Sequence, residues 1–129
     1  MFSIAYVTIL IFALTSGPHT LRYFHGRCIA EAPTVVTLEG SLSEVSAKRP
    51  TGEDYAMMVL TLTDSIVVCG DSVDAPLGGI LHLQVVGHRA AAERYMNGKV
   101  RLTGSVIRER RPPIYMPVAF IVSSVAPPN

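Results

Sequence analysis

One short phrase occurs twice in this chain, and it constrains the fold more than any other feature. Residues 36–42 read VTLEGSL and residues 100–106 read VRLTGSV. In each copy apolar residues alternate with polar ones, which is the pattern of a strand with one buried face. A glycine, Gly40 or Gly104, lies in the middle of each strand. Because a mid-strand glycine removes the side chain at a crowded bend, the phrases predict two strands that curve sharply.

The rest of the chain supplies the other elements of a small β domain. Residues 89–96 (RAAAERYM) are strong helix formers, and Asn97-Gly98 after them provides a left-handed stop. Hydrophobic patterning predicts further strands at 55–63, 80–86, 99–107 and 117–125, and a short extended piece at 66–69. Turn residues and polar composition predict a turn at 63–65, a polar connector at 29–33, and loops at 46–54, 70–79 and 108–113.

The predicted order is strand, strand, strand, helix, strand, strand, which is the element order of the OB fold. In that Greek-key barrel the first and fourth strands lie side by side, so Gly40 and Gly104 are expected at the bends that close it. The V-x-L-x-G pattern also arises by chance in β proteins. A tandem repeat is not favoured, because the helix has no counterpart after the first phrase. We predict a mainly β, five-stranded OB-like Greek-key barrel with one short helix between strands 3 and 4.

The N-terminal segment is apolar but short. Residues 2–14 (FSIAYVTILIFAL) carry no charge, and as a helix they would extend roughly 20 Å, against a hydrocarbon core of about 30 Å. This suits the apolar region of a secretory signal peptide. An uncleaved anchor and a buried element of the domain are the alternatives. We predict a signal peptide and connector at 1–27, the barrel at 28–125 and a flexible tail at 126–129, in a periplasmic or secreted protein whose mature chain has no stable membrane span.

The chain has two cysteines, Cys28 and Cys69. An even number of cysteines in a short exported protein favours a disulfide, and two unlinked buried thiols are the alternative. Together with His82 and His88, the cysteines match no standard spacing of metal ligands. The sequence therefore predicts no metal site at these residues.

Several segments resemble one bacterial family in their order and spacing. Cys28 is followed by EAPTVVTLEGSL at 31–42, VCGD stands at 68–71, NGKVRLTGSV at 97–106 and MPV at 116–118. This series, which covers 28–125, resembles exported proteins known as domain of unknown function 4431. The resemblance implies an exported small β-barrel in which Cys28 pairs with Cys69, and it implies no activity. Members often carry histidines before a closing T-P-V, whereas this chain has RRPPIY at 110–115.

The sequence offers no recognisable catalytic arrangement. It contains no G-x-S-x-G motif and no glycine loop of the kind that cradles phosphate. His82 lies in a predicted strand, where a structural role is the common one. The loop acids Asp64, Asp71 and Asp74 do not follow the spacing of a calcium-binding EF-hand. We therefore predict a protein that is not an enzyme and that needs no cofactor or metal.

Two predicted loops are basic, and they frame the surface on which OB barrels often bind single-stranded nucleic acid. Tyr55 and Tyr115 would offer stacking faces. However, the formal net charge is only +1, the chain has no tryptophan, and export is predicted, so the sequence does not favour nucleic acid. A solvated loop is the plain explanation for such charges.

We predict a non-catalytic binding or interaction module that contacts an envelope protein or an anionic ligand. A purely structural envelope component is the simplest form of that prediction. The alternative is a binder of single-stranded nucleic acid or of an anionic polymer through the basic loops 46–54 and 108–116. The residues predicted to make these contacts are Lys48, Arg49, Arg108, Arg110, Arg111 and Tyr115.

Overall fold

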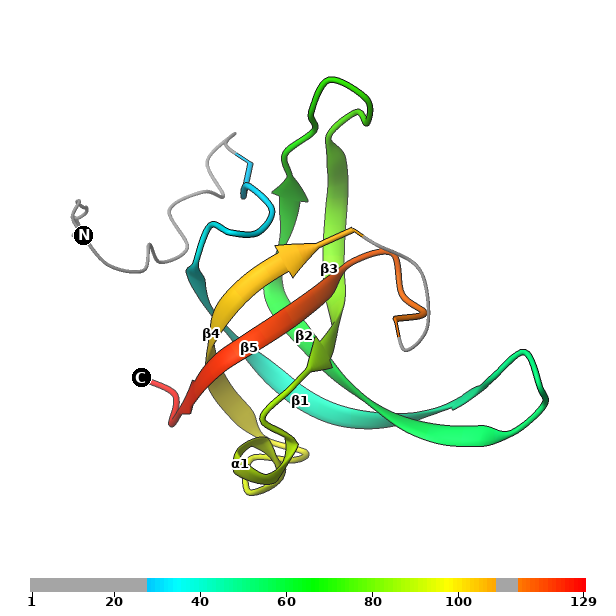
Figure 1. The fold of residues 1–129 in the computed structure, drawn as a ribbon. Coiled ribbons are helices and arrows are strands. Elements are labelled where there is room, and N and C mark those ends of the chain that lie inside the picture. Colours follow the sequence, from blue (N-terminus) through cyan, green and yellow to red (C-terminus); the bar gives the residue numbers. More distant parts are fainter. Residues whose placement is uncertain (1–27, 109–113) are drawn as a thin grey trace.

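The computed structural model describes residues 28–108 and 114–129, which wind into a closed β-barrel (Figure 1). The elements are β1 (Val36–Lys48), β2 (Asp54–Val68), β3 (Leu77–Val86), α1 (Arg89–Glu93), β4 (Lys99–Ile107) and β5 (Ala119–Ala126). The strand order is β1-β2-β3-β5-β4, with β4 pairing back onto β1. Strands β3 and β5 run parallel and the other neighbours antiparallel. The predicted OB-like barrel with a helix between strands 3 and 4 is confirmed, while the predicted signal segment at 1–27 lies outside the described residues.

The two mid-strand glycines leave no room for a side chain against the backbone of a neighbouring strand. Strands β1 and β4 pair antiparallel along the stretches that carry both glycines, as the repeated phrase predicted. A Cβ on Gly40 would come within 3.0 Å of the Thr61 carbonyl of β2. A Cβ on Gly104 would meet the carbonyl of Ile121 on β5 equally closely. Space, rather than a left-handed backbone, therefore requires glycine at both positions.

The core is made by the inward faces of the strands. Val100, Leu102 and Val106 of β4 are fully buried, in the alternation that the sequence predicted. Phe120 of β5 is the largest fully buried side chain. Ala92 of α1 is also fully buried and belongs to the same cluster, so the short helix covers one end of the barrel.

The helix is shorter than predicted. It ends at Glu93 rather than at Met96, because Arg94 and Tyr95 form a turn and Met96 then pairs with β1. Met96 forms a bridge with Leu42, and the Asn97 N–H donates to the Leu42 carbonyl over 2.7 Å. Asn97 has the left-handed backbone (φ 66°) predicted for the stop. Pairing with a strand thus outweighs helix propensity at this point.

The turn predicted at 63–65 is wrong, because β2 continues without a break to Val68. Between Thr61 and Ile66 strand β2 advances five residues, while β3 advances only two, from His82 to Ile80. The polar residues between them are therefore accommodated as a bulge, which bends a strand without reversing it. Strand β3 likewise begins at Leu77, inside the predicted loop 70–79.

The first basic loop is also shorter than predicted, because β1 continues to Lys48 and β2 begins at Asp54. Lys48 pairs directly with Asp54 across the hairpin. Figure 1 shows this hairpin projecting well beyond the barrel. We call residues 43–57 the hairpin arm, since β2 pairs with β3 only from Met58 onward.

The two ends of the described chain are tied to the barrel. Cys28 and Cys69 are joined by a disulfide, as predicted. The residue after Cys28 is not part of a polar connector, because Ile29 is buried and forms a parallel bridge with Val68. At the other end, the Asn129 N–H donates to the Glu39 carboxylate over 2.7 Å. Among the described residues, no helix has the length and apolar character needed to cross a membrane.

Candidate functional site

Two of the predicted contact residues, Arg49 and Tyr115, both lie against Tyr55 of the hairpin arm. The Arg49 guanidinium lies 4.9 Å from the centre of the Tyr55 ring. The rings of Tyr55 and Tyr115 have their centres 5.2 Å apart and are tilted by 55°. Tyr55 is placed by its pairing opposite Ala47 of β1, so Arg49, two residues further along, reaches back over the ring. We call Arg49, Tyr55 and Tyr115 the Arg-Tyr cluster.

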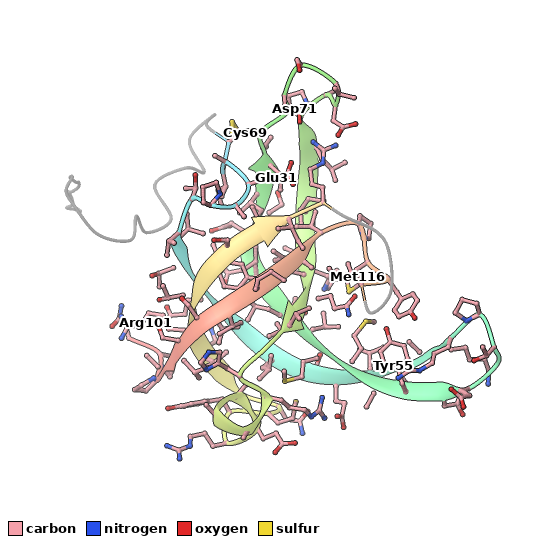
Figure 2. The ribbon with its side chains drawn as sticks, viewed as in Figure 1. Glu31, Tyr55, Cys69, Asp71, Arg101 and Met116 are labelled. Carbon is pink, nitrogen blue, oxygen red and sulfur yellow. A yellow bond between two sulfur atoms is a disulfide. The ribbon has the colours of Figure 1, made fainter. Side chains whose placement is uncertain are left out.

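Gln84 of β3 holds Tyr115 in this position. Its side-chain oxygen accepts hydrogen bonds from the backbone N–H groups of Tyr115 (2.8 Å) and Met116 (3.3 Å). Gln84 is only 4% exposed and lies opposite Val59, which is also buried. Both side chains face away from the barrel core, because their strand neighbours face into it. The segment 114–116 therefore lies over the outer surface of β2 and β3, and Figure 2 shows Met116 on the same side of the barrel as Tyr55.

Sequence reasoning did not identify Gln84 or this covering segment. The outward positions of β2 carry Met57 and Val59, two apolar residues where a solvated face would carry polar ones. That departure from strict alternation was the available signal, because an apolar outer face indicates that something covers it. The surface that OB barrels commonly use for single strands is thus partly occupied by the chain itself.

The cationic residues of the arm differ in their partners. Lys48 forms an ion pair with Asp54, with nitrogen and oxygen 2.8 Å apart, and both side chains are largely exposed. Arg49 has no carboxylate partner within 28–108 and 114–129. Its charge faces the Tyr55 ring and solvent. Arg49 is therefore the better candidate for recognising an external anion.

Arg108 lies elsewhere. Its backbone N–H donates to the Glu31 carboxylate over 2.9 Å, and its guanidinium donates to the Ala75 carbonyl over 2.8 Å. These contacts direct it toward the loop that contains Asp71, which Figure 2 shows well separated from Tyr55. The predicted contact residues Arg110 and Arg111 lie outside the described residues. The structure thus brings Arg49 and Tyr115 together and does not bring Arg108 to them.

Asp71 organises the loop near Arg108. One oxygen of its carboxylate accepts hydrogen bonds from the backbone N–H groups of Val73 and Asp74, each over 2.7 Å. The hydrogen bond from Asp74 and then that from Val73 hold the pKa of the carboxyl below its usual value, with a smaller contribution from the charge of Arg108. This carboxylate caps a local turn. No group of His, Cys, Asp and Glu side chains in the described part of the chain is arranged to hold a metal ion.

We expect the phenol of Tyr55 to report on the Arg-Tyr cluster. Burial and the neighbouring Tyr115 raise the pKa of Tyr55, while the charge of Arg49 lowers it in part. A raised pKa favours the neutral phenol. The stability that the neutral phenol contributes is therefore present below the ordinary tyrosine pKa of about 10, and it is lost as the pH rises through the pKa of Tyr55 in the folded protein. Replacing Arg49 with Ala removes the opposing charge, so the pKa of Tyr55 should rise further.

An NMR titration of the tyrosine ring carbons would measure this change. Lys48→Ala is the matched control, because it also removes one positive charge from the arm, but from a residue paired with Asp54. A Tyr55 pKa that stays constant or falls in Arg49→Ala would show that the guanidinium does not lie over the ring in solution.

Comparison with known proteins adds no assignment to this geometry. The resemblance drawn from the sequence therefore stays a prediction. A search with protein-family models found no match to this chain, and a search of curated proteins found none either.

Proposed function

We propose that this chain is an exported, non-catalytic binding module that holds an acidic segment of an envelope protein at the Arg-Tyr cluster. One observation carries this proposal. The Arg49 guanidinium lies over Tyr55, without a carboxylate partner among the described residues, and beside a second ring, that of Tyr115. Such an arrangement combines a charge, a stacking plane and two apolar ring surfaces.

The cluster is suited to carboxylates for physical reasons. A guanidinium presents a planar set of donors that matches a carboxylate, and contact with a ring limits the orientations that the guanidinium adopts. Since the guanidinium is already oriented, less conformational entropy is lost when an anion binds. A hydrogen bond to a charged group contributes about 1.5–3 kcal/mol. This is enough for recognition but not for tight binding by itself.

Export is supported by the covalent chemistry of the chain. The disulfide between Cys28 and Cys69 is compatible with an oxidising compartment, where such bonds persist. The uncharged segment at 2–14 supports the same location. Both observations favour a partner in the cell envelope or outside the cell over one in the cytosol.

Binding of single-stranded nucleic acid is the second candidate function. The Arg-Tyr cluster would offer stacking faces, and the loops 46–54 and 108–116 contribute basic residues. However, the segment held by Gln84 covers part of the β2–β3 surface, and Arg108 contacts Glu31 and Ala75. These contacts leave less free surface for a strand of nucleotides than the sequence suggested.

A binding titration with two probes separates the candidates. Hexaglutamate and an oligothymidylate of similar charge would be added to the isotope-labelled protein, and amide shifts would be followed by NMR. We expect hexaglutamate to shift the amides of Arg49, Tyr55 and Tyr115. In Arg49→Gln the dissociation constant should increase about tenfold, which corresponds to one lost charged hydrogen bond.

Lys48→Gln is the control, because Lys48 is already ion-paired, and it should change the affinity by a small factor only. The proposal is wrong if hexaglutamate leaves the cluster unperturbed at millimolar concentration. If oligothymidylate alone shifts the cluster, and does so at physiological salt, nucleic-acid binding replaces it.

A further inference from the structure

The hairpin arm has an unpaired strand edge. Strand β1 pairs with β4 only as far as Ser41, and Leu42 then forms its bridge with Met96. From residue 43 to Lys48, β1 pairs with β2 on one side and with nothing in the described part of the chain on the other. Figure 1 shows this part of the hairpin extending away from the barrel. An exposed strand edge presents backbone donors and acceptors to which another strand can add.

The residues that direct their backbone groups to this edge can be identified. Both backbone groups of Leu42 point away from β2, since its N–H donates to Gly98 and its carbonyl accepts from Asn97. Backbone groups alternate between the two sides along an antiparallel strand. The N–H and carbonyl groups of Glu44, Ser46 and Lys48 therefore point to the same side as those of Leu42, and they have no backbone partner among the described residues.

We propose that two copies of this chain associate by antiparallel pairing of their β1 edges, with Ser46 of one copy opposite Ser46 of the other. In this register Glu44 of each copy lies opposite Lys48 of its partner. All three residues of each edge then exchange hydrogen bonds across the interface. The two hairpin arms form one continuous four-stranded antiparallel sheet.

Geometry and charge select this register over the neighbouring ones. Shifting the centre toward the barrel brings Leu42, whose backbone groups are already bonded, into the interface. Shifting it toward the loop brings in Pro50, which has no N–H to donate. The central register also places Glu44 of each copy directly opposite Lys48 of the other, because the pairing is symmetric. Within one copy Glu44 is ion-paired with Arg89 and Lys48 with Asp54, so the contact across the interface would join these two ion pairs into one network of alternating charge. Opposite charges across an antiparallel pair stabilise it, whereas like charges destabilise it.

The other face of the arm gains apolar contacts in the same register. Val45, which is 42% exposed, would lie opposite Ala47 of the partner. Both belong to the face that also carries Tyr55 and Met57, through their pairing with β2. The proposed sheet thus buries an exposed branched side chain. The proposed pairing uses no residue of the Arg-Tyr cluster, so the proposal does not depend on what that cluster binds.

Sedimentation of the exported chain over a range of concentrations tests the proposal. We expect a monomer–dimer equilibrium, with the amides of Glu44, Ser46 and Lys48 becoming protected from hydrogen exchange as the dimer forms. Ser46→Pro removes an edge N–H that makes no bond within the described chain, and proline is tolerated at such an edge position. This variant should remain folded and sediment as a monomer.

Charge reversal gives an independent second test. Lys48→Glu places two carboxylates opposite one another at both ends of the interface, so the dimer dissociation constant should rise about tenfold or more. Lys99→Glu is the matched control, since it makes the same change of charge at the exposed start of β4, and it should leave the equilibrium unaltered. A chain that stays monomeric at millimolar concentration, or a dimer that Ser46→Pro and Lys48→Glu both leave intact, would overturn the proposal.

Discussion

A Gly104→Ala chain is expected to lose about 3 kcal/mol of unfolding free energy, a cost at the upper end for a side chain added to a filled space. The added Cβ would lie within 3.0 Å of the Ile121 carbonyl, which belongs to the backbone of β5. Neither strand can move alone, because β4 is paired with β1 on its other side. Urea unfolding followed by circular dichroism would measure the loss.

Gly40→Ala and Gly78→Ala complete this experiment. Gly40 is opposed by the Thr61 carbonyl and should behave like Gly104. Gly78 lies in β3 with only the Val67 side chain near, at 3.7 Å. Alanine there should change stability by less than about 1 kcal/mol, since it restricts the unfolded chain without a clash. If all three variants were equally stable, the close approach of neighbouring strands would not explain why both repeated phrases carry a glycine.

Loss of the disulfide is expected to have the other large effect. The bond between Cys28 and Cys69 joins positions 41 residues apart, and closing such a loop stabilises a fold by about 4 kcal/mol in the chain-entropy model. Small domains have a total stability of about 5–15 kcal/mol. A Cys28→Ser/Cys69→Ser chain should therefore unfold at a much lower urea concentration, or fold only partly.

The adjoining backbone gives a local readout of the same change. Ile29 exchanges hydrogen bonds with Val67 and Cys69 beside the disulfide, so its amide should exchange faster once the bond is removed. Wild-type protein reduced with dithiothreitol is the control, and its unfolding midpoint should match that of the double variant. A midpoint that is unaffected by both treatments would contradict a stabilising bond between the two cysteines in the folded protein.

Much of the barrel could be predicted because its strands are amphipathic and its bends need glycine. Strand β4 begins and ends where the alternation does, at Lys99 and Ile107. The errors occur where pairing decides the conformation of polar residues. Residues 63–65 look like a turn in isolation. However, β2 pairs with β3 both before and after them, so they form a bulge within one strand. The extra turn of helix predicted up to Met96 is likewise lost to pairing with Leu42.

The candidate site was less predictable, because it depends on contacts between residues far apart in the chain. The sequence identified Arg49 and Tyr115 by their loops, but their meeting depends on Gln84, which no loop composition indicates. Arg108 looked equivalent to Arg49 in charge and position. Its hydrogen bonds to Glu31 and Ala75, 77 and 33 residues away, direct it elsewhere, and such partners cannot be read from a local pattern.

The most direct test is a nuclear Overhauser spectrum of the protein in solution, because one spectrum reports both on the closure of the barrel and on the contact between the two rings of the Arg-Tyr cluster. We expect cross-strand signals between Leu38 and Leu102, which pair in β1 and β4, and signals between the rings of Tyr55 and Tyr115, whose centres lie 5.2 Å apart. A spectrum in which residues of β1 contact β2 but never β4, and in which the two rings share no signal, would contradict both the closed barrel and the site built on it.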